Sequence, residues 1–535
     1  MRRASRGYAV SRLSPRLAAG PRPPRLPVNA AAAFLATAAQ TLFVLATYGY
    51  LVRVVGAEAV GLWVSLVAAG MLACVADLGL SHALIWQLAL AMRDGTPATA
   101  EQPLAAVETI VTTVAAATGV ALLLAWASFP WWGGWVSTAA TTAQAQAWLV
   151  FVLVGLWLNR VADALAGALD GQQRFVERSL VSAAALLCGL LLAIAVAPRW
   201  GMDGFALVFV LQYALQLAGF ALLLRRPGPG PRWWRPRLRR SVLRDALRYG
   251  LSVQVLVMCY LVIESAVKLA LAGRGSLAEV AYFDLAFRIG KGVRGLLASA
   301  LRVLVPRLAS ETSAANQTVQ RDRAYATSFA ALLLFALPIY AGIVAAAQPL
   351  SQLLVGRSEP AFAAALAASL AAWAGYNLTD PALNLSLASG RMRWPVLGHL
   401  LALALVLGVV FLRGPQAPAT GGLGIYAQLT LAILAGCSAT LIGIHRSERA
   451  AWSLLRPLPT LAALAGAAVV GALGPALPAL LPDWPAATHW AVAGSVWAGY
   501  TAALWWLSPA GCEVRGALLA GIARKASTRR PASAG

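Results

Sequence analysis

Apolar residues along this chain form fourteen runs of about 20 residues, separated by charged residues, Gly and Pro clusters or Trp. A run of this length can cross the hydrocarbon core of a bilayer as an α-helix, because each helical residue advances the chain by about 1.5 Å. The sequence therefore predicts an all-α integral membrane protein with about 14 transmembrane helices. The predicted spans are residues 28–52, 60–91, 104–129, 146–169, 179–197, 204–224, 249–272, 280–305, 324–348, 361–388, 395–412, 423–444, 459–481 and 489–507.

One long charged segment interrupts this pattern after the sixth span. It carries nine arginines and one aspartate, and it begins with a stretch rich in Pro and Gly. Val60–Trp63 aligns with Val280–Phe283 where the chain enters the second helix on either side of it, which favours an internal repeat. We expect two pseudo-symmetric six-helix lobes plus two C-terminal helices. The predicted parts are 1–27 (disordered basic cytoplasmic tail), 28–224 (N-terminal lobe), 225–248 (Arg-rich cytoplasmic linker), 249–444 (C-terminal lobe), 445–507 (two additional helices) and 508–535 (basic cytoplasmic tail).

The composition excludes a soluble protein. Hydrophobic residues make up 60% of the chain and charged residues only 12%, about half the charged share of globular proteins. The net charge of +23 would indicate nucleic-acid binding in a soluble protein. Here 32 of the 43 Lys and Arg residues lie on the side of the N-terminus, 5 lie in the opposite loops, and 6 lie within spans. This asymmetry predicts that both termini are cytoplasmic, with the basic linker fixing topology and attracting anionic lipid heads; no nucleic-acid partner is expected.

The predicted exterior loops argue against an enzyme. The longest of them, residues 130–145, has no charged residue, so it cannot supply the acids or arginines that a membrane glycosyltransferase or polymerase would need. The five cysteines are scattered, with no CxxC pattern and no adjacent His, so we predict neither a disulfide nor a metal site. A scaffold that recruits polysaccharide enzymes through its basic segments remains an alternative to a transporter.

Charged residues within the spans are the strongest functional signal, because each Arg, Lys or Asp at a helix centre costs about 2.5–3.5 kcal/mol on insertion. In span 280–305 five of them fall within roughly a 120° arc of one helix face. Two of the five are one turn apart and are expected to pair, whereas the last two could instead extend to the cytoplasmic interface. The five are Asp284, Arg288, Lys291, Arg294 and Arg302.

Other spans add further polar residues. Glu264 and Lys268 have the spacing of an intrahelical pair, as do Arg160 and Asp163. The alternative for each is a buried pair that only fixes helix packing. Together they favour a polar, net cationic cavity between the two lobes, with no cofactor but with acids that could carry a coupling H⁺ or Na⁺. The predicted cations are Arg288, Lys291, Arg294, Lys268 and Arg160, and the predicted coupling or polar residues are Asp77, Glu264, Asp284, Asp380 and Asn377.

The residue types suggest an anionic substrate. An Arg side chain stays charged when it is desolvated and donates two parallel hydrogen bonds, so it suits a diphosphate. Either a soluble anion or a lipid with a diphosphate head would meet these requirements.

Three stretches resemble the bacterial polysaccharide flippases of the Wzx type, which belong to the multidrug/oligosaccharidyl-lipid/polysaccharide exporter superfamily. They are residues 52–84, with a Gly-Leu-Trp entry and an Asp-Leu-Gly-Leu-Ser turn, residues 278–289, and LASGRMRWPVL at 387–397. The resemblance implies alternating-access export of an undecaprenyl-diphosphate-linked oligosaccharide across the bacterial inner membrane for surface polysaccharide (O-antigen type) synthesis. It implies that Arg288, Lys291 and Arg294 bind the anion, and that polysaccharide polymerase and glycosyltransferases are partners.

Two alternatives to this function remain. The layout of spans 459–481 and 489–507 is similar to that of lipid II flippases, so a peptidoglycan precursor is a second candidate substrate. A multidrug cation antiporter of the same superfamily is a third candidate, although it would be expected to have an acidic rather than a cationic interior.

Overall fold

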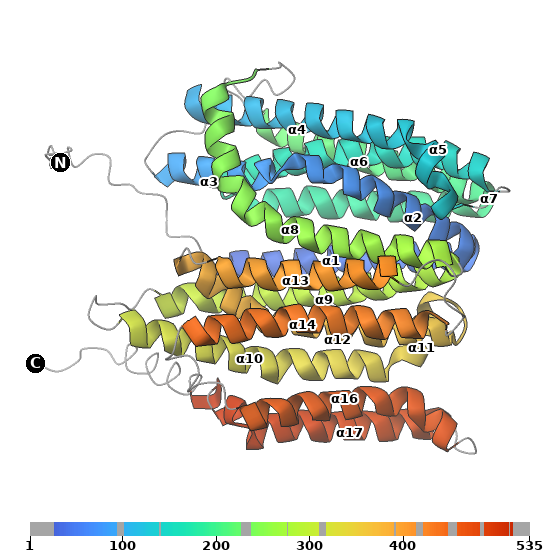
Figure 1. Ribbon diagram of the computed structural model, residues 1–535, viewed down its shortest axis with the longest axis vertical. Helices are drawn as coiled ribbons and strands as arrows, with labels where there is room; N and C mark the ends of the chain where they lie inside the picture. Colours follow the sequence, from blue (N-terminus) through green and yellow to red (C-terminus); the bar gives the residue numbers. More distant parts are fainter. Residues whose placement is uncertain are drawn as a thin grey trace, which may run out of the picture.

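The structure, a computed structural model, is a bundle of long, roughly parallel and antiparallel helices (Figure 1). It describes residues 26–93, 101–137, 141–225, 237–274, 277–309, 317–389, 392–412, 421–447, 457–481, 486–512 and 514–516. The helices are α1 (Leu26–Val54), α2 (Ala57–Ala73), η2 (Cys74–Asp77), α3 (Leu80–Arg93), α4 (Glu101–Ala127), α5 (Phe129–Trp132), η3 (Gly133–Trp135), α6 (Thr142–Gly171), α7 (Phe175–Leu224), α8 (Arg240–Arg274), α9 (Leu277–Ala309), α10 (Gln317–Ala345), α11 (Ala347–Leu354), α12 (Pro360–Ser389), α13 (Arg393–Leu412), α14 (Gly421–Ser447), α16 (Pro457–Leu480) and α17 (Ala486–Leu507).

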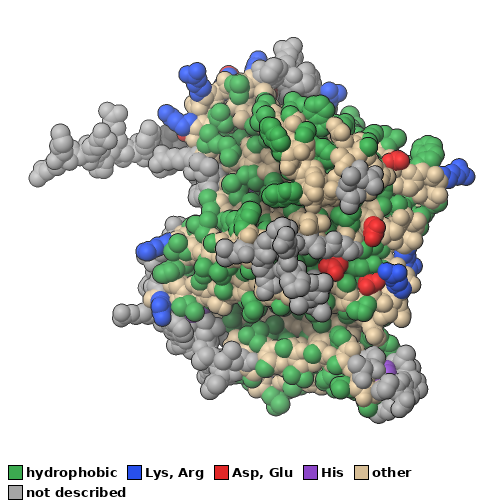
Figure 2. All heavy atoms as spheres, turned by 45° about the vertical axis from the view of Figure 1, so that its right-hand side comes forward, with side chains coloured by type: hydrophobic (Ala, Val, Ile, Leu, Met, Phe, Trp, Pro, Cys, Tyr) green, Lys and Arg blue, Asp and Glu red, His purple; other side chains and the backbone are tan. Residues whose placement is uncertain are grey.

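The predicted all-α membrane fold is confirmed. Each of the fourteen predicted spans falls on helix, and ten helices of the described chain are long and apolar enough to cross a membrane. Large apolar side chains such as Leu42 and Leu123 are exposed on the outside of the bundle. Figure 2 shows apolar side chains over most of one face, with Lys and Arg toward its two ends. Such a surface is stable only in lipid, so this is a multi-pass membrane protein.

Two predicted spans, 179–197 and 204–224, are joined in the 50-residue α7. Pro198 lies inside this helix and lacks the amide hydrogen that would continue the hydrogen-bond ladder. Gly201 adopts φ 56° and ψ −140°, a conformation that costs little only for glycine. The chain therefore bends sharply at this point, and α7 consists of two helices joined at the bend.

The predicted span 60–91 is broken rather than continuous. After α2 the chain tightens into the 3₁₀ turn η2, and Leu78 then adopts a left-handed conformation with φ 51°. Gly79 follows with φ 73° before α3 begins. The run Asp-Leu-Gly of the sequence is this break, which leaves Asp77 at the end of the 3₁₀ turn.

Helix α8 connects the two halves of the molecule. The segment predicted as linker, 225–248, is described at residue 225 and from residue 237, and the helix begins inside it at Arg240. There the backbone amide of Arg239 donates to Thr109 Oγ1 of α4 at 3.3 Å, and Gln87 Nε2 of α3 donates to the carbonyl of Val242 at 3.4 Å. Farther along, α8 packs against α2 and α13 (Figure 1). One helix thus contacts both lobes.

The last two helices lie on the outer side of the second lobe, against α10 (Figure 1). Trp497 Nε1 of α17 donates to the carbonyl of Pro338 in α10 at 2.8 Å. A Cβ on Gly474 of α16 would lie 2.0 Å from the carbonyl oxygen of Ala345, so glycine permits the close approach of these helices.

The lobes meet along α1, α2 and α9. A Cβ on Gly61 of α2 would lie 1.7 Å from the carbonyl oxygen of Leu277, where α9 begins. A Cβ on Gly292, deeper in α9, would lie 2.2 Å from Thr41 of α1. At the end of α1, Arg53 donates to the carbonyl of Gln352 in α11. The lobes are therefore closed at the end where α2 and α9 begin.

Candidate functional site

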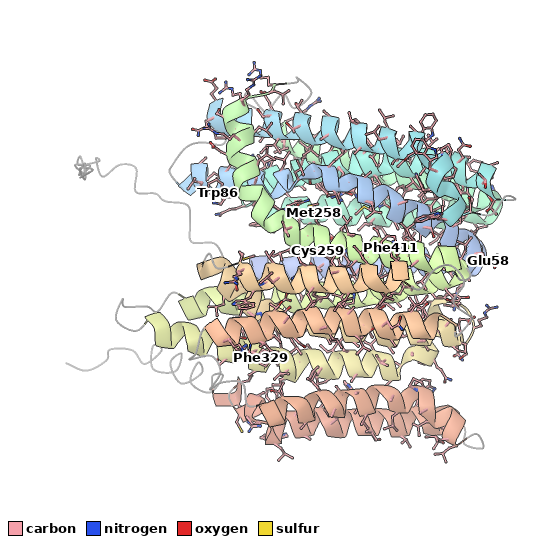
Figure 3. All side chains as sticks on the ribbon, in the orientation of Figure 1. Glu58, Trp86, Met258, Cys259, Phe329 and Phe411 are labelled. Atoms are coloured by element: carbon pink, nitrogen blue, oxygen red, sulfur yellow. The ribbon has the colours of Figure 1, made fainter. Side chains whose placement is uncertain are left out.

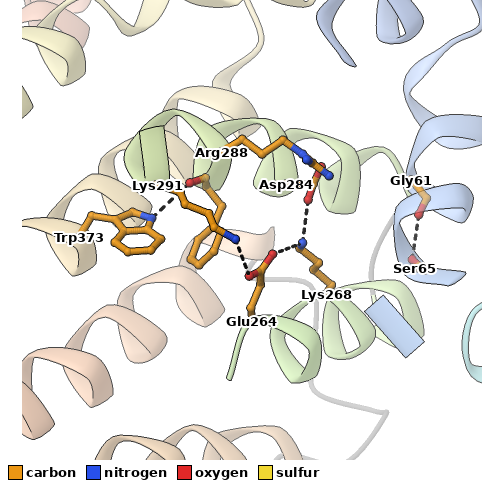
Figure 4. A network of polar contacts seen from close by, with 9 residues as sticks. Gly61, Ser65, Glu264, Lys268, Asp284, Arg288, Lys291 and Trp373 are labelled. Atoms are coloured by element: carbon orange, nitrogen blue, oxygen red, sulfur yellow. Dashed lines mark hydrogen bonds and ion pairs between the residues drawn. The ribbon is translucent and has the colours of Figure 1, made fainter. Parts of the chain in front are cut away.

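Helices α8 and α9 bring five predicted residues into one ionic network, shown in Figure 4. Lys268 Nζ lies 2.6 Å from Glu264 Oε1 and 2.7 Å from Asp284 Oδ1. Asp284 Oδ2 accepts a 2.5 Å hydrogen bond from Arg288 Nε. Because Asp284 is only 1% exposed, its charge must be balanced inside the protein, and both Lys268 and Arg288 contact it.

Lys291 completes this network at its accessible side. Its Nζ is 4.0 Å from Glu264 Oε2, at the limit of an ion pair, and its side chain is 59% exposed. The network then contains three cations, Lys268, Arg288 and Lys291, and two carboxylates, Glu264 and Asp284, so it has one surplus positive charge. We define these five residues as the cationic cluster.

Aromatic rings surround the cationic cluster. The Arg288 guanidinium lies 3.9 Å from the ring centroid of Tyr48 in α1, so the cluster contacts the first lobe. Lys291 Nζ is 5.7 Å from the ring of Tyr260, and Trp373 Nε1 donates to the carbonyl of Phe287 at 3.2 Å. Aromatic faces attract cations while excluding water, which strengthens the electrostatic interactions of the site.

Arg294 lies almost three helical turns from Asp284 and pairs with a different helix. Its Nη2 and Nε lie 2.7 Å and 3.4 Å from the two carboxylate oxygens of Asp380 in α12. The guanidinium is also 5.4 Å from the ring of Trp373. The side chain therefore reaches toward α12 rather than the membrane surface. Arg302, the fifth charged residue of that face, lies outside the described side chains.

The remaining predicted residues are separate from the cationic cluster. Arg160 Nη2 is 2.8 Å from Asp163 Oδ2 within α6, and Asp77 is buried at the η2 turn of the first lobe. Asn377 is fully buried and its Nδ2 donates to the Tyr340 hydroxyl at 2.6 Å, joining α12 to α10. The structure thus separates the predicted set into a cluster on α8 and α9, a pair between α9 and α12, Asn377 between α12 and α10, and a group in the first lobe.

The sequence predicts a cationic cavity between the two lobes, and two cavities of the described chain can be compared with that prediction. One of about 940 Å³ lies away from the cationic cluster, between α3, α4 and the start of α8, where it is lined by Trp86 (labelled in Figure 3), Gln102 and Arg239. The other, of about 20 Å³, adjoins Glu264 and can hold about one water molecule.

Sequence reasoning missed the aromatic residues of the site. Tyr48, Tyr260 and Trp373 lie in apolar runs, where an aromatic side chain is ordinary core. No periodicity distinguishes them from the other rings of those spans. Their role follows only from the packing of α1, α8 and α12 around α9.

Comparisons with known proteins agree with this architecture. No protein family model matches the chain, and no curated protein sequence does either. Among solved structures, a lipid II flippase MurJ in an inward closed conformation is 11% identical, with a TM-score of 0.65 over 89% of this chain and 99% of that one. An inward-facing multidrug resistance MATE family transporter of the MOP superfamily is 16% identical, with a TM-score of 0.56 over 77% and 96%. An outward-facing one is 14% identical, with a TM-score of 0.53 over 80% and 96%.

At these identities the likeness establishes the fold. The chain has the two-lobe helical fold that these MOP-superfamily transporters and the flippase share, and the fold covers nearly the whole of each of them.

Proposed function

We propose that this protein is a flippase that moves a polyprenyl-diphosphate-linked oligosaccharide across the bacterial inner membrane by alternating access, for surface polysaccharide synthesis. Both termini are cytoplasmic in this proposal, which rests on the distribution of Lys and Arg along the chain. Glycosyltransferases and a polysaccharide polymerase would supply and consume the substrate. The chemistry is binding and movement, without covalent catalysis.

The observation that carries the proposal is the surplus cation of the cluster. Lys291 is the most exposed of its three cations and has only a 4.0 Å contact with Glu264. A diphosphate head could accept hydrogen bonds from Lys291 and displace Asp284 from Arg288, so its charge would replace that of a protein carboxylate. The tyrosine and tryptophan rings beside the cations suit the sugar or prenyl parts of the same lipid.

The net positive charge also selects among substrates. A multidrug cation would approach a cluster with one surplus positive charge and be repelled, since like charges in a medium of low polarity interact strongly. An anionic lipid would be attracted by the same charges. The cationic antiporter is therefore the weaker candidate.

Lipid II is a second candidate substrate, favoured by a specific observation. Helices α16 and α17 pack against α10 in addition to the two six-helix lobes, and the similar solved flippase is named for lipid II. Both substrates have a prenyl diphosphate, so the cationic cluster fits either of them. The glycan decides between the two.

Transport by the purified protein in lipid vesicles tests the proposal. A fluorescent polyprenyl-diphosphate oligosaccharide is placed in one leaflet, and its arrival in the other leaflet is followed with a membrane-impermeant quencher. Lys291→Ala should slow flipping about tenfold or more, because a charge-assisted hydrogen bond contributes about 1.5–3 kcal/mol. Lys291→Arg should retain most of the rate because it keeps the charge.

Arg244→Ala is the matched control, since it removes a long cationic side chain that is 83% exposed and distant from the cluster. Unchanged flipping in Lys291→Ala combined with Arg288→Gln, at normal yield of folded protein, would contradict the proposal. Parallel assays with lipid II and with a lipophilic cation separate the two alternatives.

A further inference from the structure

The break in the second span places a carboxylate in an unusual setting. Leu78 adopts a left-handed backbone conformation that residues other than glycine rarely adopt, and Gly79 follows with positive φ. Helical hydrogen bonding therefore stops here. Asp77 is the last residue of the 3₁₀ turn before this break and is 8% exposed. Broken helices inside membrane transporters are where ions and substrates bind.

The Asp77 carboxylate is only half satisfied. Its Oδ2 accepts a 3.3 Å hydrogen bond from Ser81 Oγ, whereas its Oδ1 is buried and has no hydrogen-bond partner among the described residues. Arg160 of α6 is its electrostatic neighbour and is held instead by Asp163 and by Asn159 Oδ1 at 3.1 Å. Arg160 Nε is likewise buried without a hydrogen-bond partner in the same part of the chain. A donor and an acceptor are thus both left unused near each other.

The charges of this group identify what could bind. Asp77 and Asp163 face one cation, Arg160, so the three side chains carry one surplus negative charge. Cys74 and His82 are the other titratable neighbours of Asp77. Arg160 would repel a metal cation at Oδ1, whereas one proton on Oδ1 neutralises the group without adding a charge beside the guanidinium.

We propose that Asp77 is a proton-binding site that drives the export of the anionic lipid, an inference that rests on the proposed function. The proton occupies Oδ1 while Arg160 pairs with Asp163. When the proton leaves Oδ1 for water, Arg160 moves from Asp163 to the Asp77 carboxylate. The proton and the guanidinium are therefore alternative partners of the same carboxylate.

A chain of polar side chains connects this site to the cationic cluster. Asn159, which accepts from Arg160, is hydrogen-bonded to Tyr213 of α7. Tyr213 is an electrostatic neighbour of Tyr48 and Arg288, and the ring of Tyr48 lies 3.9 Å below the Arg288 guanidinium. A change of partner by Arg160 would thus alter the electrostatic environment of Arg288 through Asn159, Tyr213 and Tyr48.

Infrared pH-difference spectroscopy of the purified protein tests the proton site without requiring transport. The wild type should show a carboxylic C=O band that disappears as the pH rises, and Asp77→Asn should lack that band. In Asp163→Asn the Arg160 guanidinium has only the Asp77 carboxylate to pair with, so the band should disappear at a lower pH than in the wild type. Ser81→Ala keeps the carboxylate but removes its donor to the charged form, so the midpoint of the band should move to higher pH. If Asp77→Asn fails to fold, the shift of the band in Ser81→Ala still tests the proposal.

In vesicles, flipping by the wild type should respond to an imposed pH gradient, and flipping by Asp77→Asn should not. A band that persists in Asp77→Asn, or does not move in Ser81→Ala, would overturn the proposal. So would a band that responds to Na⁺ at constant pH. A protein with the Asp77 band that flips no prenyl diphosphate would refute the proposed substrate while leaving the proton site in place.

Discussion

At the scale of single residues, Asp284 is the side chain on which the cationic cluster depends. It is 1% exposed, and its two oxygens contact Lys268 at 2.7 Å and Arg288 at 2.5 Å. Asp284→Asn keeps the shape and removes the charge, which leaves Arg288 without its carboxylate inside the protein. Breaking one partner of a buried ion pair typically costs about 3–5 kcal/mol. We therefore expect markedly lower stability, measured by unfolding of the detergent-purified variant.

The matched control is Asp245→Asn, because the Asp245 side chain is 62% exposed and lies 3.9 Å from Arg244 at the start of α8. Exposed pairs of this kind contribute little, so its unfolding should match that of the wild type. Equal stability of Asp284→Asn and Asp245→Asn would show that the cluster is hydrated rather than buried.

At the scale of helices, Arg294 and Asp380 connect α9 to α12. The guanidinium meets both carboxylate oxygens, at 2.7 Å and 3.4 Å, so the pair fixes orientation as well as distance. Arg294→Ala, Asp380→Ala and the double variant form a cycle from which the coupling energy follows. We expect about 0.5–3 kcal/mol from denaturant unfolding of the four proteins. The same cycle on Arg244 and Asp245 should give no measurable coupling, and additive effects at Arg294 and Asp380 would contradict the connection.

The sequence predicts pairs within a helix far better than pairs between helices. Helical periodicity puts Asp284 and Arg288 one turn apart on one face, and the structure joins them. The partner of Arg294 is 86 positions away, and no pattern in either span identifies it. The position of Tyr48 under Arg288 depends in turn on how α1 lies on α9. Distances across the bundle are set by packing, which a single sequence does not encode at any fixed spacing.

At the scale of the whole molecule too, the sequence predicts single helices better than it predicts how they pack together. Apolar length and polar interruptions predict where the membrane helices lie, because lipid requires both. The course of α8 is different: its first turns are amphipathic, with Ala246 buried against the first lobe and Arg244 exposed. Nothing in that composition indicates that the helix then continues onto α13 of the second lobe. A helix that belongs to both lobes would bend or tilt whenever the lobes move.

One contact that opposes such movement is at Gly61, where α2 meets the start of α9. A Cβ there would lie 1.7 Å from a backbone oxygen, and backbone cannot move aside as a side chain can. Gly61→Ala should therefore separate the lobes at this end and increase the distance between spin labels at positions 58 and 358, both exposed, in a background with Cys188→Ser and Cys512→Ser. Arg53→Ala, which removes the hydrogen bond to Gln352, should shift the distances in the same direction by less.

Gly499→Ala is the control for these distances, because a Cβ on Gly499 meets nothing within 4 Å. If alternating access moves the lobes about this contact, Gly61→Ala should also slow flipping, since a closed end must re-form in each cycle. Unchanged label distances in folded Gly61→Ala would mean that α2 yields locally and that the lobes are held together elsewhere. Longer distances with an unchanged rate would instead separate the closure of this end from the step that limits transport.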